Sequence, residues 1–232
     1  MFNWSFKLRE QAGLCIPKGP SFKRAKRINF RIDGAEITLR APRHSSHFSS
    51  KEAIQPRKEY EIDVIRMHPF KSYNYSWLYK TLLQRSWGFY GDWFTGYKGG
   101  LSMCVALVTR EETSQTVSLF RPKVFENTLA DFLRYRYADD IYKGTQEWLA
   151  PVDWKVVNAW PSPAATYYVR PNIYNAGSTD RYFLFPITDK HFIEFQFNLH
   201  RECSGFQSEK DQQISISPLE KLSTDIINSI NI

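Results

Sequence analysis

The sequence predicts an α+β protein in which helices pack on a central antiparallel β-sheet. Three observations predict this class: a hairpin pattern over residues 181–201, a second over residues 28–39, and helical periodicity over residues 127–144 and 217–231. The chain has 232 residues, of which 42% are hydrophobic and 16% aromatic, so it can bury a large core. We expect a basic N-terminal arm at residues 1–27 and a single domain at residues 28–232.

Residues 181–201 are expected to form the central hairpin. Two runs rich in aromatic and β-branched residues flank Asp189-Lys190, which we interpret as a two-residue loop. This register places Leu184 opposite Phe195 and Tyr182 opposite Phe197. Side chains alternate along a strand. One apolar face should therefore hold six residues: Tyr182, Leu184, Ile193, Phe195, Phe197 and Leu199.

The remaining elements follow from local patterns. Asp33-Gly34 is a type I′ turn signal between two short strands, one with Ile28, Phe30 and Ile32 on a shared face and the other with Ile37 and Leu39. Apolar or alternating runs predict strands at residues 60–67, 101–109, 154–160 and 166–169, and residues 116–120 are expected to pair with 101–109. Residues 202–213 are expected to be a polar loop.

Two helices are predicted. The first starts at Asn127 or Thr128 and ends at Gly144, with an apolar stripe formed by Leu129, Leu133, Tyr137 and Ile141. The second starts with a capping box at Ser217 and Glu220, with Pro218 at its first position. Its apolar stripe is formed by Leu219, Leu222, Ile226 and Ile230.

Residues 73–97 are unusually aromatic and lie in an expected insertion at about residues 41–100. We predict a short helix at residues 76–86, with Leu78 and Leu82 inward, and then a glycine-rich loop. Three interpretations remain open: filling of the core, a surface for a protein partner, or stacking of nucleobases. We select the partner surface, because binding residues concentrate on loops held by a rigid scaffold. The candidate anchors are Tyr75, Trp77, Trp87, Tyr90, Trp93 and Tyr97.

The positive charge is concentrated near the N-terminus. Residues 1–58 hold 13 Lys and Arg against 4 Asp and Glu, whereas the other residues hold 18 against 20. Such a segment is either a solvated arm or a binding site for nucleic acid or another anionic surface. The candidate anion-binding residues are Lys18, Lys23, Arg24, Lys26 and Arg27.

Neither a metal nor a cofactor site is expected. His44 and His47 have a ligand-like spacing, but no Cys, Asp or Glu near in sequence completes a site. No nucleophile-elbow, zinc-protease or Walker-type motif occurs. The three widely spaced cysteines fit a reducing compartment, and no apolar run is long enough for a secretory signal or a membrane span. We therefore expect a cytoplasmic protein.

Three segments together resemble the PsbP/DcrB-like α/β proteins: the hairpin at residues 32–42 that ends in proline, the strand pair at 182–199, and the closing helix at 217–232. The resemblance implies an antiparallel sheet with helices packed on it. It also implies a binding protein without catalytic residues, because members of that superfamily are mostly of this kind. Some are chaperones for type VI secretion effectors.

Three functions are consistent with these features. The first is a non-enzymatic protein-binding module, such as an immunity protein or chaperone of a bacterial toxin or secretion system, whose partner would be a toxin or effector. The second is a nucleic-acid or anionic-surface binder that acts through the basic segment. The third is an enzyme whose site is assembled in space around His68, His191 or His200.

Overall fold

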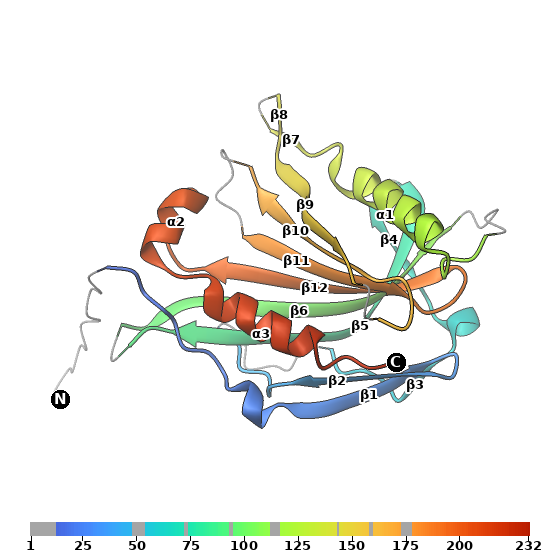
Figure 1. Ribbon diagram of the computed structural model, residues 1–232, viewed down its shortest axis with the longest axis horizontal. Coiled ribbons are helices and arrows are strands. Elements are labelled where there is room, and N and C mark those ends of the chain that lie inside the picture. The colour runs from blue at the N-terminus through green and yellow to red at the C-terminus, as the bar shows by residue number, and fades with distance from the viewer. Residues whose placement is uncertain are drawn as a thin grey trace, which may run out of the picture.

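A seven-stranded antiparallel sheet forms the middle of the molecule, with the strand order β4-β5-β6-β12-β11-β10-β9 (Figure 1). The computed structural model describes residues 13–47, 54–71, 74–92, 95–111, 117–142, 144–157, 160–172 and 178–232. The strands of the sheet are β4 (His68–Lys71), β5 (Asn74–Tyr90), β6 (Tyr97–Arg110), β9 (Trp148–Val156), β10 (Ala165–Pro171), β11 (Thr179–Pro186) and β12 (His191–Arg201).

Smaller elements surround this sheet. A three-stranded sheet has the order β2-β1-β3, and β7 pairs with β8. Their bounds are β1 (Lys26–Ile32), β2 (Ala35–Ala41), β3 (Glu59–Tyr60), β7 (Ile141–Tyr142) and β8 (Thr145–Gln146). The helices are α1 (Pro122–Tyr137), α2 (Gln207–Gln213) and α3 (Ser217–Ile227), with 3-10 turns at Phe22–Arg24 and Ile62–Val64. The predicted antiparallel sheet with helices packed on it is confirmed at this level.

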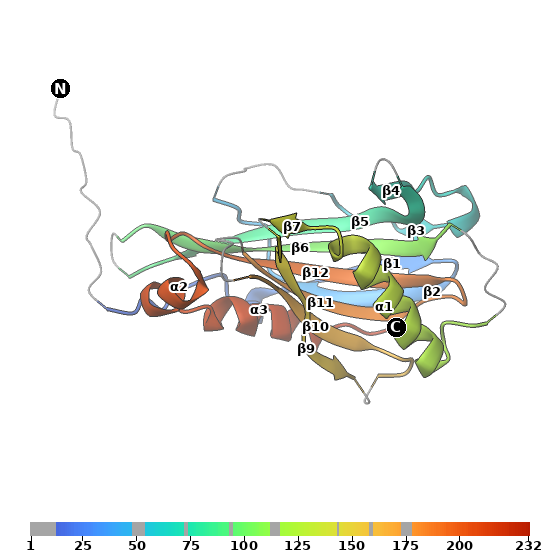
Figure 2. The same cartoon turned by 90° about the horizontal axis from the view of Figure 1, so that it is seen from above.

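Both faces of the main sheet are covered. The β1–β2 hairpin and α3 pack on one face, where Phe30, Leu39 and Leu219 join Phe195 and other sheet residues in a buried core. On the other face α1 lies across one end of the strands, as the view from above shows (Figure 2). None of the helices in the described part of the chain is long and apolar enough to cross a membrane.

The central hairpin is present, but its predicted register is wrong by one residue. Phe183 pairs with Phe195 and Pro186 with Phe192, so residues 187–191 connect the last pair. Ile187 and Thr188 both donate their backbone N–H to the carbonyl of His191, which closes this longer turn. A shift of one residue exchanges the two faces of one strand relative to the other. The six residues expected on one face are consequently split: Tyr182 and Leu184 face α1, whereas Ile193, Phe195, Phe197 and Leu199 face α3.

The first hairpin is as predicted. Ile32 pairs with Ala35 across Asp33-Gly34, and both turn residues have positive φ, at 46° and 81°. This is the conformation that a type I′ turn requires at its two central positions. The five apolar residues assigned to the inner face are all buried, so the hairpin packs on the main sheet through one face and leaves the other outward.

The aromatic segment is part of the main sheet. Residues 74–90 form the long strand β5 rather than a helix followed by a loop, and β5 pairs with β6 along most of its length. The periodicity of Leu78 and Leu82 misled the helix prediction, because a strand covered on both faces need not alternate between apolar and polar residues. The expected insertion therefore supplies two neighbouring strands of the sheet.

Several element boundaries also differ from prediction. Helix α1 starts at Pro122, five residues before Asn127, and ends at Tyr137, so Ile141 lies beyond it and is exposed. Helix α3 starts at Ser217, but no side-chain capping bond is present, which makes the predicted capping box wrong. Within residues 60–67, Tyr60 ends β3 and Ile62–Val64 form a 3-10 turn, so the predicted strand is wrong. Residues 117–120 are not a strand, and α2 interrupts the expected loop at 202–213. Residue 116 lies outside the described residues.

The predicted arm is wrong for residues 13–27. Cys15 exchanges backbone hydrogen bonds with Gln213 and Ser215, and Lys18 does so with Tyr90 at the end of β5. Lys26 and Arg27 already belong to β1. Paired backbone groups hold this segment against the rest of the molecule. Residues 1–12 lie outside the described residues.

Candidate functional site

Two of the predicted partner anchors belong to the cores. Trp77 is buried beneath α1, with its ring 4.9 Å from that of Phe132. Trp87 is 1% exposed on the opposite face, and its indole N–H donates to the carbonyl of Arg43 at 3.1 Å. These tryptophans cannot touch a partner without unfolding, so their assignment as surface anchors is wrong.

Tyr90 and Tyr97 lie together at the far end of β5 and β6. Their ring centroids are 5.9 Å apart, and the ring of His47 stacks on Tyr97 at 4.4 Å. Tyr90 is 41% exposed, whereas burial raises the pKa of Tyr97 to about 12. The side chain of Tyr75 and the whole of Trp93 lie outside the described residues.

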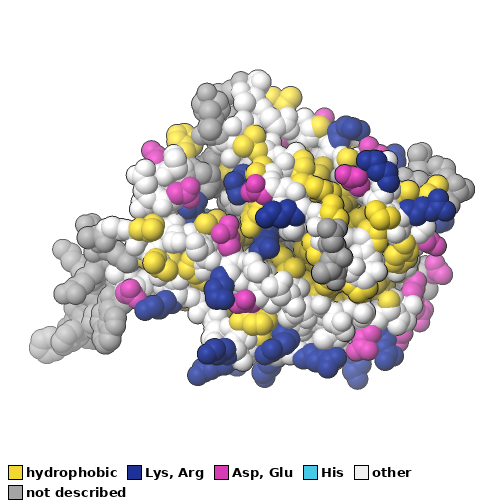
Figure 3. Space-filling view, in the orientation of Figure 1, with side chains coloured by type: hydrophobic (Ala, Val, Ile, Leu, Met, Phe, Trp, Pro, Cys, Tyr) yellow, Lys and Arg dark blue, Asp and Glu magenta, His cyan; other side chains and the backbone are white. Residues whose placement is uncertain are grey.

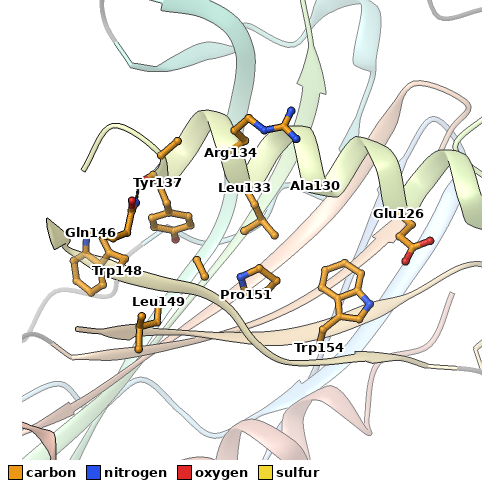
Figure 4. Close-up of a pocket in the computed structure, with 12 residues that line it drawn as sticks. Glu126, Ala130, Leu133, Arg134, Tyr137, Gln146, Trp148, Leu149, Pro151 and Trp154 are labelled. Carbon is orange, nitrogen blue, oxygen red and sulfur yellow. Dashed lines mark hydrogen bonds between the residues drawn. The ribbon is translucent and has the colours of Figure 1, made fainter. Parts of the chain in front are cut away.

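An apolar depression lies elsewhere, between α1 and the edge strand β9. We call it the α1–β9 groove, and it has a volume of about 640 Å³. Hydrophobic side chains gather on this side of the molecule, over β9 and beside α1 (Figure 3). In the close-up, Trp148 and Trp154 lie on either side of Pro151 along β9, and Leu133 points down from α1 toward them (Figure 4).

A second depression, of about 500 Å³, extends the groove past Trp154. The two share Glu126 and Trp154 in their walls, and the second continues to Trp160 and Pro161. Three large apolar side chains in these walls are substantially exposed: Phe120 at 45%, Leu149 at 45% and Val156 at 57%. Clustered exposed apolar surface of this kind marks interaction sites more often than isolated exposed residues do.

A stack of aromatic rings supports the floor of the groove. Trp154 stacks on Tyr167 at 5.5 Å with an interplanar angle of 9°, and Tyr167 stacks on Tyr182 at 5.0 Å. The hydroxyl of Tyr182 lies 2.7 Å from that of Tyr137 on α1. Rings from β9, β10, β11 and α1 are thus joined in one series. Because each ring is held by the next, the groove is formed before any partner arrives.

A buried ion pair fixes α1 on the sheet next to this stack. One guanidinium nitrogen of Arg136 lies 2.9 Å and 3.0 Å from the two carboxylate oxygens of Glu194, and the other donates to Gln196 at 3.2 Å. Burial raises the pKa of Glu194 above its ordinary value, and the charge of Arg136 opposes that rise. Four aromatic rings lie 5.3–5.7 Å from the Arg136 carbon, those of Phe70, Phe132, Tyr137 and Tyr182.

Hydrogen bonds continue from this pair along the sheet. Asp180 accepts from Gln196 at 2.8 Å, from Asn198 at 2.7 Å and from the hydroxyl of Tyr182 at 3.2 Å. The charged and polar groups under α1 are therefore bonded mainly to one another. Such a network positions a helix, because each polar group would be costly to bury without its partner.

The free edge of β9 is poorly suited to accept another strand. Pro151 lacks a backbone N–H, Asp153 has a positive φ of 54°, and the pairing of β9 with β10 contains two irregularities. Proline and local bulges are common devices that prevent strand addition at a sheet edge. A partner in the groove would thus be held by side-chain contacts rather than by an extension of the sheet.

The histidines considered for an assembled catalytic site have separate surroundings. His191 lies in the β11–β12 turn, where its Nδ1 is 2.9 Å from the hydroxyl of Thr188, and burial lowers its pKa. His200 pairs with Glu202 at 3.1 Å, and His68 is exposed on β4. Among the described residues, no group of three or more His, Cys, Asp or Glu side chains is arranged to hold a metal ion.

The predicted anion-binding residues separate into two groups. Lys18 pairs with Asp92 at 2.6 Å, whereas Lys23, Arg24, Lys26 and Arg27 are exposed along the 3-10 turn and β1.

Sequence reasoning missed the α1–β9 groove. Its only sequence signal is the alternation of Trp148, Ala150, Val152 and Trp154, which places four apolar side chains on one side of a strand. No protein-family model, curated protein or solved structure matches the chain.

Proposed function

We propose that this protein is a binding module whose partner is another protein, held in the α1–β9 groove. The observation that carries the proposal is the continuous apolar depression with exposed Phe120, Leu149 and Val156 in its walls. The proposed occupant is a segment of the partner that carries bulky apolar side chains. The resemblance to PsbP/DcrB-like proteins adds a narrower class, an immunity protein or chaperone with a toxin or effector as its partner.

A macromolecule fits the groove better than a small ligand does. A volume of about 640 Å³ is within the range of small-molecule sites, which are roughly 300–1,000 Å³. However, the depression continues past Trp154 into a second one, and a small ligand in either would leave the exposed side chains of the other uncovered. A protein segment lying along both would cover Leu149 and Val156 together.

The rim favours an apolar partner over a charged one. Glu126 pairs with Lys123 at 3.0 Å, and Arg134 pairs with Asp131 at 3.0 Å, so the charges of α1 along the groove are balanced within the helix. Tryptophan and tyrosine, which line the groove, are enriched among the residues that contribute most to binding.

The side chains that could take part in catalysis are bonded to one another or held in unreactive forms, which favours a binding function over an enzymatic one. Arg136 and Glu194 bond to each other, and Asp180 is occupied by three donors. Burial raises the pKa of Cys15, Cys104 and Cys203, which opposes formation of the nucleophilic thiolate. The well-formed depression contains apolar walls rather than converging acids and bases.

The test uses two substitutions at positions of similar exposure, one in the groove and one outside it. Leu149→Asp places a charge on the wall of the groove at a position that is already 45% exposed, so folding should be little affected. Tyr90→Ala removes a similarly exposed aromatic side chain from the other end of the sheet. Each variant and the wild type are immobilised, proteins are captured from the source cells, and the captured partner is purified for affinity measurement.

The proposal expects one partner that binds the wild type and Tyr90→Ala equally. Leu149→Asp should weaken binding by about thirtyfold or more, because the loss of a central apolar contact costs about 2 kcal/mol. Equal binding by Leu149→Asp, or selective loss in Tyr90→Ala, would place the partner elsewhere. Unchanged melting temperatures show that the variants remain folded.

A further inference from the structure

The outer face of the β1–β2 hairpin and its surroundings carry a concentration of exposed cations. Along the lower margin of the molecule, where Figure 1 shows β1, Lys and Arg side chains form a row (Figure 3). We call this set the basic face, and nine exposed residues make it up: Lys23, Arg24, Lys26, Arg27, Arg31, Arg40, Arg43, Arg57 and Lys58.

The strand pairing explains why these charges point outward together. Ile28, Phe30 and Ile32 of β1 are buried against the core, so the alternate residues Arg27, Asn29 and Arg31 face away from it. On β2 the same alternation turns Arg40 outward. The register places Arg27 directly opposite Arg40. Like charges at opposite positions of two paired strands repel each other, and this repulsion is relieved when an anion binds to both arginines.

Two carboxylates lie beside the basic face, because Glu36 on β2 and Glu59 on β3 stand opposite Arg31. Within the described residues, none of its nine cations lies within ion-pairing distance of an acidic side chain. Arg27 bonds to the neutral side chains of Asn29 and Thr38, and Arg40 lies over the ring of Phe22 at 5.4 Å. By contrast, Lys18 and Lys221 have carboxylate partners.

We infer that the basic face binds the phosphate backbone of double-stranded nucleic acid, independently of the protein partner proposed above. The cations follow β1 from its start, next to Lys23 and Arg24, to its end, where Arg31 lies beside Lys58. Seven strand residues extend over roughly 23 Å, which is too long for a single small anion. A row of cations of this length suits a polymer such as double-stranded DNA, which carries a negative charge about every 1.7 Å along its axis.

The side chains around these cations decide between classes of polyanion. Single-stranded nucleic acid is bound by stacking its bases on aromatic rings, but Phe30 and Tyr60 are buried, and the half-buried ring of Phe22 is already covered by Arg40. Binding to a membrane surface combines cations with apolar side chains that enter the lipid. The outward residues of β1 and β2 are Arg27, Asn29, Arg31, Glu36, Thr38 and Arg40, none of them apolar. The remaining class of polyanion is a nucleic-acid duplex, whose phosphate backbone the cations would contact without reading its bases.

The experiment measures binding of a short fluorescent DNA duplex by anisotropy between about 50 and 200 mM salt, because phosphate contacts release counterions in proportion to their number. The test variant combines Arg27→Gln, Arg31→Gln and Arg40→Gln. The control combines Lys123→Gln, Lys155→Gln and Lys190→Gln, which removes the same charge from exposed positions outside the basic face. Melting temperatures of both variants are compared with that of the wild type.

Wild type and control should bind with the same steep salt dependence. In the test variant, the slope of the logarithm of affinity against the logarithm of salt should become less negative by about 3. A variant with lysine at the same three positions should retain binding, which separates loss of charge from loss of structure. The inference is overturned if the duplex does not bind, if test and control weaken equally, or if vesicles of anionic phospholipid bind and the duplex does not.

Discussion

Arg136 near the end of α1 holds both carboxylate oxygens of Glu194 on the central strand β12, at 2.9 Å and 3.0 Å. Glu194 is 3% exposed, so this pair is buried between helix and sheet. Tyr137, the next residue, lines the α1–β9 groove and bonds to Tyr182 beneath it. The ion pair therefore positions one wall of the proposed binding surface.

Breaking this pair from one side should be costly. Arg136→Met leaves an uncompensated buried carboxylate and should lower the free energy of unfolding by about 3–5 kcal/mol. The double variant Arg136→Met with Glu194→Leu should recover much of that loss, because no charge remains to be buried. Urea denaturation of wild type, single and double variants measures the difference. A single variant as stable as wild type, or a double variant no better than the single, would show that the pair does not hold α1 in place.

Truncation of Trp87 should lower the stability much more than truncation of Tyr90, although both are aromatic residues of β5. Trp87→Ala opens a cavity at a residue that is 1% exposed and should cost about 3–5 kcal/mol of stability. Tyr90→Ala, at a residue that is 41% exposed, should cost far less. Chemical denaturation distinguishes them. Similar losses in both variants would contradict the placement of Trp87 in the core.

The sequence patterns predicted the structure correctly where neighbouring residues alone determine the local conformation. Asp33-Gly34 specifies a two-residue turn by itself, so the β1–β2 register and its inner face were predicted correctly. The 181–201 hairpin lacks such a turn. Both of its faces carry buried apolar residues, so the hydrophobic pattern permits either register. The turn at residues 187–191, closed by hydrogen bonds to the carbonyl of His191, decided between them.

The same reasoning explains the missed site. Helix α1 was expected to start at Asn127 or Thr128, residues that favour a helix start, and its actual start at Pro122 has no side-chain cap. The groove also needs β9 beside α1, a contact between segments that no local pattern encodes. The sequence shows that Trp148 and Trp154 are aromatic, but only the tertiary fold places both of them in the groove beside α1.

The turn at His191 should make stability depend on pH. Burial lowers the pKa of His191 below its ordinary 6.5, so the unfolded chain takes up a proton more readily than the folded one. Its contribution to stability is present above a pH of about 6.5 and is lost as pH falls through the lower folded-state pKa. His191→Gln should therefore lose less stability than wild type between about pH 7 and pH 5.

Denaturation midpoints across that pH range provide the measurement. His68→Gln, at an exposed position on β4, is the matched control and should follow the wild type. Parallel curves for wild type and His191→Gln would show that the histidine contributes nothing to the pH dependence.

Site-specific photocrosslinking tests partner binding in the α1–β9 groove most directly. Benzoylphenylalanine is introduced at position 149, in the groove wall, and separately at position 90, at the other end of the sheet, and each protein is irradiated with its captured partner. The proposed function predicts a covalent adduct from position 149 and none from position 90. An adduct from position 90 alone, or none from position 149 while the partner remains bound, would contradict it.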